Sequence, residues 1–408
     1  MSYSFRLYES IREVPLEDWD LLRRHRPDVF MDPRFVAAVE RSMSDAARFW
    51  CLLVHDAARR PVASACLSLF QLDLALLGQP TLRRIADWAR RVFPGFLKLP
   101  VLFCGLPVSA GQSHLCLAPQ SDWRQSLATI DEALCRLARR HRAVLVVFKE
   151  FSEEDRDPLD HLLSLGYVRG ESLPMNHFAP QVGSFEEFCA SLRSHYRYKI
   201  RRSRRKFEQA GYRVEHWSAR DALDHYSDEV HELYRSVVDR AEVKLEYLPR
   251  AFFEELARQF PDEIRFTAVR KEGRIVGFAW GLSASMRHQN LFIGLDYRLN
   301  AEADLYFNLM AEDLACAIGE GARDVQVGQT ADVFKSRMAC YPRPRYVYVR
   351  GTGAIVGWLV RGAAGWCFPP PAPPPRRDLF RVPSPGKRIS RGTGPRLSAA
   401  YRRTAWPH

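Results

Sequence analysis

The sequence contains a weak internal repeat, which limits the folds that are open to it. Residues 48–70 form two β-rich runs around a polar turn, and residues 265–285 repeat this hairpin pattern with the same opening pair, Arg-Phe. After a further β-rich segment, each hairpin pattern is followed by a helix and a strand, within residues 131–151 and 308–329. The chain is therefore expected to be an α/β protein, of the α+β kind, made of two similar halves that meet near Pro180.

The length of the chain agrees with two domains. A chain of 408 residues with 47% hydrophobic content can bury two cores. We expect an N-terminal domain at residues 1–180, a C-terminal domain at 181–362 and a tail at 363–408. From Phe368 the sequence is rich in proline and arginine and poor in apolar residues, so burial offers little to offset the entropy of ordering it. This composition predicts a disordered tail.

The net charge does not itself indicate a nucleic-acid-binding protein. The formal charge is +12, but residues 376–403 hold nine Lys or Arg and one acidic residue, Asp378, and so contribute +8. The remaining +4 is a modest excess for so long a body. A basic tail can contact RNA or anionic lipid, and it can equally be a solvated extension. No recognised reader motif for sequence-specific DNA binding is present.

The cysteines and the N-terminus indicate a cytoplasmic protein. The nine cysteines are scattered, contain no CxxC pair and lie mostly in apolar runs, which is typical of small buried side chains in a reducing compartment. The N-terminus lacks the order of a secretory signal, and the apolar stretch at residues 96–110 is too short to span a bilayer. Histidine, cysteine and aspartate residues do not cluster with metal-ligand spacing, so no metal is expected.

Two basic helices are predicted. Seven of the twelve residues at 195–206 are Lys or Arg, and Tyr196, Ile200 and Phe207 form an apolar stripe that turns the arginines elsewhere. Residues 81–96 form a second basic amphipathic pattern that includes Trp88. Such a helix can lie weakly on an anionic membrane surface, although most helices of this kind pack on their own domain.

The order hairpin, strand, helix, strand is that of the GNAT superfamily, and the second half resembles FemAB-like acyltransferases. The resemblance is carried by residues 191–211, 232–256, 291–310 and 328–349, and more loosely in the first half by residues 102–111. It implies two tandem GNAT folds with mixed central sheets. It also implies the transfer of an acyl or aminoacyl group to an amine acceptor.

The resemblance leaves the donor open between acyl-CoA, which we expect first, and aminoacyl-tRNA. Coenzyme A-binding relatives hold the pyrophosphate with a Gly-rich turn that begins with Arg or Gln. Here the matching turn starts at Arg298, has Ala301 in place of the first glycine and places Glu302 beside the phosphates. This departure also leaves room for a binding module without catalysis, which would hold RNA or anionic lipid.

Four residues near strand ends of the second half are the expected catalytic and donor groups. Lys335 could polarise the acyl carbonyl or hold an anionic group, and Gln329 could supply a further hydrogen-bond donor. Asp296 could accept the amine proton and Tyr306 could donate to the leaving group. Each also has a structural alternative: Lys335 as a solvated turn residue, Asp296 as a helix cap and Tyr306 as a packed side chain. At Ala339 the sequence departs from relatives, which tend to have glycine.

The remaining expected residues bind substrate. The resemblance places the basic helix beside the donor or acceptor groove, where Arg197 and Arg201 would guide a phosphate-bearing substrate. Glu246 and Tyr247 lie where the family contacts the acceptor, and Arg298 would face the donor phosphates.

Overall fold

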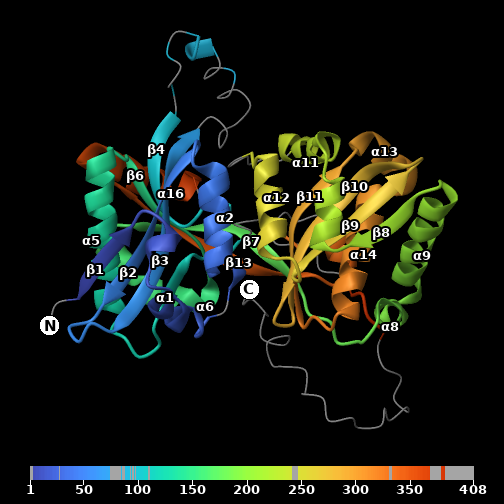
Figure 1. The fold of residues 1–408 in the computed structure, drawn as a ribbon, viewed down its shortest axis with the longest axis horizontal. Coiled ribbons are helices and arrows are strands. Elements are labelled where there is room, and N and C mark those ends of the chain that lie inside the picture. The colour runs from blue at the N-terminus through green and yellow to red at the C-terminus, as the bar shows by residue number, and fades with distance from the viewer. Residues whose placement is uncertain are drawn as a thin grey trace.

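The computed structural model describes residues 3–26, 28–73, 84, 88–91, 93, 96, 98–108, 111–240, 247–329, 333–367 and 378–381. In this part of the chain, thirteen strands form one mixed sheet that runs through both halves of the molecule. The halves lie side by side, and helices pack against the sheet in each of them (Figure 1).

The sheet of the first half consists of antiparallel neighbours followed by one parallel pair. β1 to β4 pair in chain order, and β6 pairs parallel with β4 through residues 101–104 and 145–148. Both faces of β2 are buried, because Cys51 and Leu53 pack in one apolar cluster while Leu52 packs in another. The strands are β1 (Ser4–Tyr8), β2 (Ala47–His55), β3 (Pro61–Asp73), β4 (Lys98–Cys104), β5 (Leu115–Leu117) and β6 (Leu145–Ser152). The helices are η1 (Ile11–Glu13), α1 (Leu16–Arg23), η2 (Val29–Met31), α2 (Pro33–Met43), α5 (Trp123–His141), α6 (Glu153–Leu159) and α7 (His161–Ser164).

The second half repeats this order. β8 to β11 are antiparallel neighbours, and β12 pairs parallel with β11 only through residues 287–289 and 324–326. β11 continues to Leu295 beyond that pairing, so the sheet opens between β11 and β12. The strands are β8 (Arg213–Trp217), β9 (Ile264–Lys271), β10 (Arg274–Ala284), β11 (Arg287–Leu295) and β12 (Asp324–Gln326). The helices are α8 (Phe185–Ser191), α9 (Ser194–Gln209), α10 (Ala219–His225), α11 (Asp228–Arg240), α12 (Arg250–Gln259), α13 (Tyr297–Ala303), α14 (Leu305–Gly319) and α15 (Val333–Arg337).

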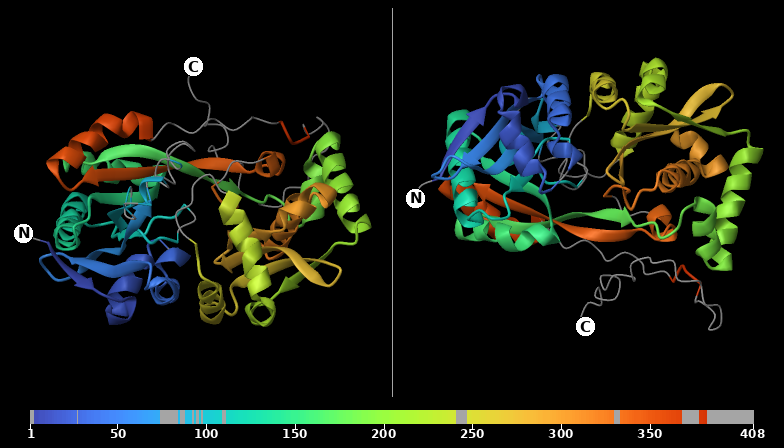
Figure 2. Two further views of the ribbon diagram at one scale, coloured as in Figure 1. Left: turned by 90° about the horizontal axis from the view of Figure 1, so that it is seen from above. Right: turned by 60° about the horizontal axis from the view of Figure 1, so that its bottom comes forward.

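Two long strands join the halves. β7 (Val168–Phe178) and β13 (Tyr341–Gly351) are antiparallel neighbours that run from one half into the other (Figures 1 and 2). β13 pairs with β6 on its other side, and β7 pairs with β12. After β13, α16 (Ala354–Cys367) packs on the same two strands. The last strand of the chain therefore lies between two strands of the N-terminal 180 residues.

Side-chain packing also crosses between the halves. Phe35 of α2 and Phe252 of α12 belong to one apolar cluster, with ring centroids 6.3 Å apart. The Arg41 guanidinium lies 2.5 Å from the Glu255 carboxylate beside them. The two helices are neighbours at the centre of Figure 1. A shared core of this kind holds the halves in one arrangement.

The repeat predicted from the sequence is confirmed. The two expected hairpins are β2–β3 and β9–β10, and the two expected helix–strand pairs are α5–β6 and α14–β12. The boundary near residue 180 stays a prediction, since the sheet continues across it. Most of the basic pattern at residues 81–96 lies outside the described residues.

Part of the expected disordered tail packs on the second half. Leu379 is buried in an apolar cluster there, although most of residues 363–408 lie outside the described part of the chain. The Arg193 amide donates to the Leu379 carbonyl at 2.9 Å, and the Arg381 amide donates to the Ser191 carbonyl at 3.0 Å. The Arg193 side chain forms an ion pair with Asp378. These backbone contacts tie residues 378–381 to the junction of α8 and α9.

Candidate active site

A cavity of about 450 Å³ lies in the second half between α9, the start of α14 and α15. Its volume is within the range of small-molecule sites in proteins, roughly 300–1,000 Å³. We call this cavity the α9–α14 pocket. It is lined by Lys199, Arg202, Ser203, Lys206, Asn300, Asp304, Tyr306, Phe307, Phe334 and Arg337.

The charges of the α9–α14 pocket are mainly positive. Among the described lining residues, four are cationic and one, Asp304, is a carboxylate; the cations are Lys199, Arg202 and Lys206 of α9 and Arg337 of α15. Lys206 Nζ lies 3.4 Å from Asp304 Oδ1. The Nε atom of Arg337 is buried and has no hydrogen-bond partner among the described residues. An anionic ligand would therefore find more cations in the pocket than the protein itself neutralises.

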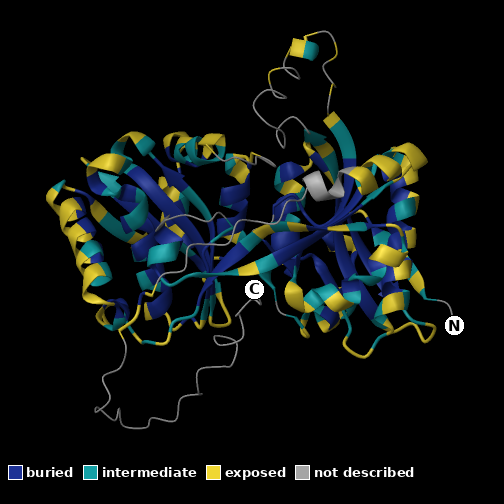
Figure 3. Cartoon of the chain, turned by 180° about the vertical axis from the view of Figure 1, so that it is seen from behind, coloured by how far each residue is buried: buried dark blue, intermediate teal, exposed yellow. Residues whose placement is uncertain are grey.

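The amphipathic pattern of α9 sets which residues reach the pocket. Ile200 and Phe207 are buried against the second half, and Ser203 Oγ, between them, donates to Asp304 Oδ2 at 3.1 Å. Because residues three and four apart share a helix face, the side chains at 199, 202 and 206 flank this stripe and border α14. The rest of α9 consists mostly of exposed or half-buried positions at the edge of the molecule (Figure 3).

The N-terminus of α14 opens into the same pocket. Its N-cap residue Asp304 has a left-handed backbone, with φ 50°, and makes no side-chain capping bond. The Tyr306 amide donates to Asn300 Oδ1 at 2.9 Å. A helix N-terminus attracts negative charge through its dipole, so α14 acts in the same direction as the four cations.

Lys335 is not among the lining residues of the α9–α14 pocket, although Phe334 and Arg337 of the same helix, α15, are. It is buried, and its Nζ is 3.6 Å from the point where a Cβ of Gly328 would stand. Ala339, with φ 57°, ends α15 in the left-handed region, and the Cys340 amide then donates to the Lys335 carbonyl at 3.2 Å. This turn is a Schellman-type helix end, which explains why glycine would suit position 339.

Beyond Gly328, a group of polar residues lies where the two halves meet, and all of them are buried except the half-buried Gln329. We call Lys149, Glu150, Asn176, Gln329 and Arg345 the junction cluster. Gln329 Nε2 donates to Glu150 Oε1 at 3.1 Å, which joins the second half to β6 of the first. The Asn176 amide donates to the Gly328 carbonyl at 3.1 Å and thereby joins β7 to the same loop. Lys335 and the junction cluster therefore meet at Gly328, the residue next to Gln329.

Of the expected catalytic residues, Tyr306 lines the α9–α14 pocket, Lys335 and Gln329 lie at the junction, and Asp296 lies elsewhere. Asp296 is the N-cap of α13: its Oδ1 accepts from the Arg298 amide at 3.0 Å, and its Oδ2 lies 2.7 Å from Arg298 Nη2. The Arg298 guanidinium lowers the pKa of Asp296, so this carboxylate is a weak base. These contacts favour the capping role of Asp296. They also turn Arg298, whose side chain is 87% exposed, away from the pocket.

The expected substrate-binding arginines of α9 lie outside the pocket lining. Arg197 Nη1 donates to the carbonyls of Ala190 and Leu192, at 3.3 Å and 3.4 Å, and so caps the end of α8. Arg201 is exposed. The predicted helix, α9, lines the α9–α14 pocket with other cations, those at 199, 202 and 206, and the substrate-binding roles of Arg197 and Arg201 stay predictions.

Of the expected acceptor residues, Tyr247 joins neither group. Tyr247 is 46% exposed and its hydroxyl donates to Asp239. Glu246 lies outside the described residues. Their assignment to the acceptor stays a prediction.

The sequence reasoning missed Lys149, Glu150 and Arg345. The first two are adjacent charges inside the apolar strand β6, and both are only 6% exposed. Burial raises the pKa of the Glu150 carboxyl. Two neighbouring charges in a short apolar run were the available signal, because strands buried on both faces seldom contain them.

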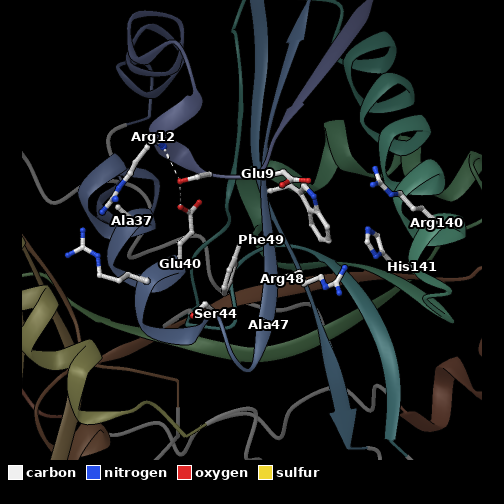
Figure 4. Close-up of a pocket in the computed structure, with 13 residues that line it drawn as sticks. Glu9, Arg12, Ala37, Glu40, Ser44, Ala47, Arg48, Phe49, Arg140 and His141 are labelled. Carbon is white, nitrogen blue, oxygen red and sulfur yellow. Dashed lines mark hydrogen bonds between the residues drawn. The ribbon is translucent and has the colours of Figure 1, made fainter.

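A second cavity, of about 520 Å³, lies in the first half between α2, β2 and the end of α5. In Figure 4, Arg48, Arg140 and His141 lie on one side of Phe49, and Glu40 lies on the other. Burial, together with Arg48 and Arg140, lowers the pKa of His141. The described lining of this cavity includes none of the residues predicted to form the site.

In the described part of the chain, no three His, Cys, Asp or Glu residues are grouped so as to hold a metal ion. Within the same residues, no helix has both the length and the apolar character needed to cross a bilayer.

Comparison with solved structures gives the fold. A tandem GNAT protein from the clavulanic acid biosynthesis pathway has a TM-score of 0.50 and 12% identity to this chain, over 86% of this chain and 99% of that one. FemX has a TM-score of 0.50 and 11% identity, over 84% of this chain and 96% of its own. At such identities the similarity shows the fold alone. The protein has a tandem GNAT fold.

Comparison with protein families identifies the family of this chain. No curated protein matches the sequence. Residues 10–294 match the FemAB-like family, which is described as peptidoglycan biosynthesis/recognition. The match ends before α13, so the pocket residues of α14 and α15 and the lysine at 335 lie beyond it. Because it spans more than half of the chain, the protein belongs to the FemAB-like family.

Proposed function

We propose that the protein is an N-acyltransferase that moves an acyl group from acyl-CoA to an amine, with the donor phosphates in the α9–α14 pocket. The family and the tandem GNAT fold support an acyltransferase-like role. The observation that supports the donor site is the excess of cations at the start of α14, formed by Lys199, Arg202, Lys206 and Arg337. Phosphate groups bind well to such charge-assisted donors. Acyl-CoA is a cytoplasmic metabolite, so the proposal places the reaction in the cytoplasm.

The expected chemistry is direct transfer. The amine nitrogen attacks the thioester carbonyl carbon, negative charge grows on the carbonyl oxygen, and the carbon–sulfur bond then breaks. The Lys335 ammonium would stabilise the growing charge, and the Tyr306 hydroxyl, which lines the pocket, would protonate the leaving thiolate.

The donor site is tested by two double variants of one helix. Arg202→Ala with Lys206→Ala removes pocket cations, and Arg201→Ala with Arg205→Ala removes the same charge from outside the pocket. The pocket variant should bind coenzyme A about 10²- to 10⁴-fold more weakly by calorimetry at low salt, since it loses two contacts between a cation and a phosphate and each contributes about 1.5–3 kcal/mol. The control should bind it within about twofold of the wild type. Equal affinity for coenzyme A in the wild type and the pocket variant would contradict the assignment of the donor site to the α9–α14 pocket.

Aminoacyl-tRNA is the second candidate donor, and one observation favours it. The residues that correspond to a pyrophosphate turn, Arg298 to Ala303, are folded into α13, and Arg298 is engaged by Asp296. In addition, the basic face of α9 at Arg201 and Arg205 extends beyond the pocket, over an area that a long polyanion could cover. If tRNA is the donor, the Arg201 and Arg205 variant should lose affinity for charged tRNA while the affinity for coenzyme A is absent in every form of the protein.

A further inference from the structure

The junction cluster contains three buried charges without an ion-pair partner. Lys149 and Glu150 are each 6% exposed and Arg345 is 5% exposed, and none of the three forms an ion pair with a described residue. Lys149 Nζ donates only to the Pro107 carbonyl, at 3.3 Å. Buried charges are normally paired or bound to a ligand, because leaving water is costly for an ion. Three such groups in one place indicate a site for a charged ligand.

Glu150 is held in an unusual backbone conformation. It has φ 64° and lies in an irregularity of the β6–β13 pairing, where two residues of β6 stand opposite Val347. A bulge of this kind redirects a side chain, and the left-handed conformation is unfavourable for a residue other than glycine. Gln329 bonds one oxygen of its carboxylate, whereas Oε2 is buried and has no partner among the described residues. The strand is therefore distorted around a carboxylate that keeps one acceptor atom open.

Arg345 stands beside this carboxylate. Its Nε donates to the Gly111 carbonyl at 2.6 Å and its Nη1 to its neighbour Pro344, so it binds neutral carbonyl groups rather than an acid. The Gly111 backbone amide also favours the charged form of Glu150 and so lowers its pKa, against the larger effect of burial, which raises it. With φ 76°, Gly111 allows this approach, and a Cβ there would stand 2.7 Å from Met175. Glu150 and Arg345 are thus opposite charges that converge on Gly111 without forming an ion pair.

The cluster lies next to the expected catalytic lysine. Gln329, which holds Glu150, directly follows Gly328, against which Lys335 packs. Phe334, the residue before Lys335 in α15, lines the α9–α14 pocket. The pocket and the cluster therefore both border the segment that carries Lys335.

We propose that the junction cluster is the acceptor site, that Glu150 takes the proton of the acceptor amine, and that the acceptor is an amine that also carries an anionic group, held by Arg345. The inference rests on the proposed acyl transfer and adds its second substrate. The ammonium of the acceptor gives up a proton to Glu150, and the free amine attacks the thioester carbon. A carbon–nitrogen bond forms, the carbon–sulfur bond breaks, the Tyr306 hydroxyl protonates the thiolate, and the second proton of the nitrogen restores the Tyr306 hydroxyl. Glu150 then returns its proton to solvent.

The charges of the cluster explain the choice of acceptor class. A simple alkylamine would pair with Glu150 but would leave Arg345 buried beside a second cation. An amine with a carboxylate or phosphate gives each of the two residues an opposite charge. Carboxylate and phosphate share the same oxyanion chemistry toward a guanidinium, so both are tested.

The experiment uses the full chain and two readouts. Glu150→Gln is compared with Glu154→Gln, which changes an exposed glutamate of α6. Transfer from acetyl-CoA is measured to alanine, lysine, dialanine, O-phosphoethanolamine and butylamine. We expect Glu150→Gln to lower kcat by about 10²- to 10⁴-fold and to abolish the acid limb of the kcat/KM profile against pH, as for loss of a general base. Glu154→Gln should behave as the wild type. A wild-type kcat in Glu150→Gln would overturn the proton-acceptor role.

Arg345→Gln tests the acceptor class. It should raise KM for the acceptors with an anionic group, whereas KM for butylamine, the anion-free probe, should stay the same or fall, because a like charge is removed. Thermal shift with the same five amines, without a donor, gives a readout that does not need turnover: the anionic amines should stabilise the wild type and not the Arg345 variant. Stabilisation by butylamine alone, or by none of the amines, would overturn the proposal that the acceptor is an amine with an anionic group. If coenzyme A fails to bind the wild type, the proposed function is wrong, whereas coenzyme A binding with an unaffected Glu150 variant contradicts only this inference.

Discussion

Lys335 packs against Gly328, with its Nζ 3.6 Å from the point where a Cβ would stand, and it is only 3% exposed. Charge interactions are strong at so dry a position. Lys335→Ala should therefore lower kcat by about 10²-fold, or roughly 3 kcal/mol, with a smaller change in KM. Lys335→Arg should restore little, because a bulkier planar group has to enter the same space. Steady-state kinetics, with circular dichroism to confirm folding, measures both variants, and an unchanged kcat in Lys335→Ala would exclude the role.

Ala339→Gly should stabilise the protein. Ala339 adopts φ 57° at the end of α15, a conformation that disfavours residues with a Cβ. Glycine removes that strain but gains entropy in the unfolded chain, so we expect a net gain of up to about 1 kcal/mol in the free energy of unfolding. Urea unfolding measures it. A matched change at Ala301, inside α13, should instead destabilise by about 1 kcal/mol, because that residue is helical.

Glu150→Gln should raise stability while it lowers activity. Burial holds the pKa of Glu150 above its ordinary value of 4.5, so the folded protein binds this proton more tightly than the unfolded chain does. Stability therefore declines as the pH rises from the unfolded to the folded pKa, and the loss persists above it. The variant should unfold at a higher temperature than the wild type at about pH 8, and the difference should shrink toward about pH 4. A lower midpoint at about pH 8 would contradict the buried, unpaired state of the carboxylate.

Removal of the tail should destabilise the second half, in contrast to the expectation from composition. Leu379 is 6% exposed, and residues 378–381 share backbone hydrogen bonds with Ser191 and Arg193. Deletion of residues 368–408 should lower the midpoint of thermal unfolding by a few degrees, since a buried leucine contributes about 1.5–3 kcal/mol. Deletion of residues 382–408 alone keeps these contacts and serves as the control. Equal midpoints for the two deletions would show that the contact contributes nothing.

The sequence predicted what depends on local periodicity. The hairpins and the helices α5, α9 and α14 follow from patterns of two and of about four residues, and so does the buried stripe of Ile200 and Phe207. Periodicity does not tell which cations beside that stripe meet a neighbour. Lys199 and Arg202 reach the pocket because α9 packs against α13 and α14, which is a tertiary relationship.

The junction could not be predicted in this way. The backbone irregularity at Glu150 depends on its pairing with β13, nearly two hundred residues away in the chain. In the sequence Arg345 is one more arginine, between Pro344 and Tyr346, and only the position of β13 beside β6 buries it. Long-range strand pairing leaves little trace in a single sequence.

The place of β13 has a consequence for the order of events during synthesis. A ribosome releases the first half of the chain long before residues 341–351 exist, and until then the β13-facing edges of β6 and β7 have no partner. Unpaired edges are sites of aggregation, so the nascent chain needs protection for the time taken to translate about 160 further residues. Release of the finished chain and closure of the sheet are thereby coupled: a polypeptide that stops before residue 341 leaves both halves with an open edge.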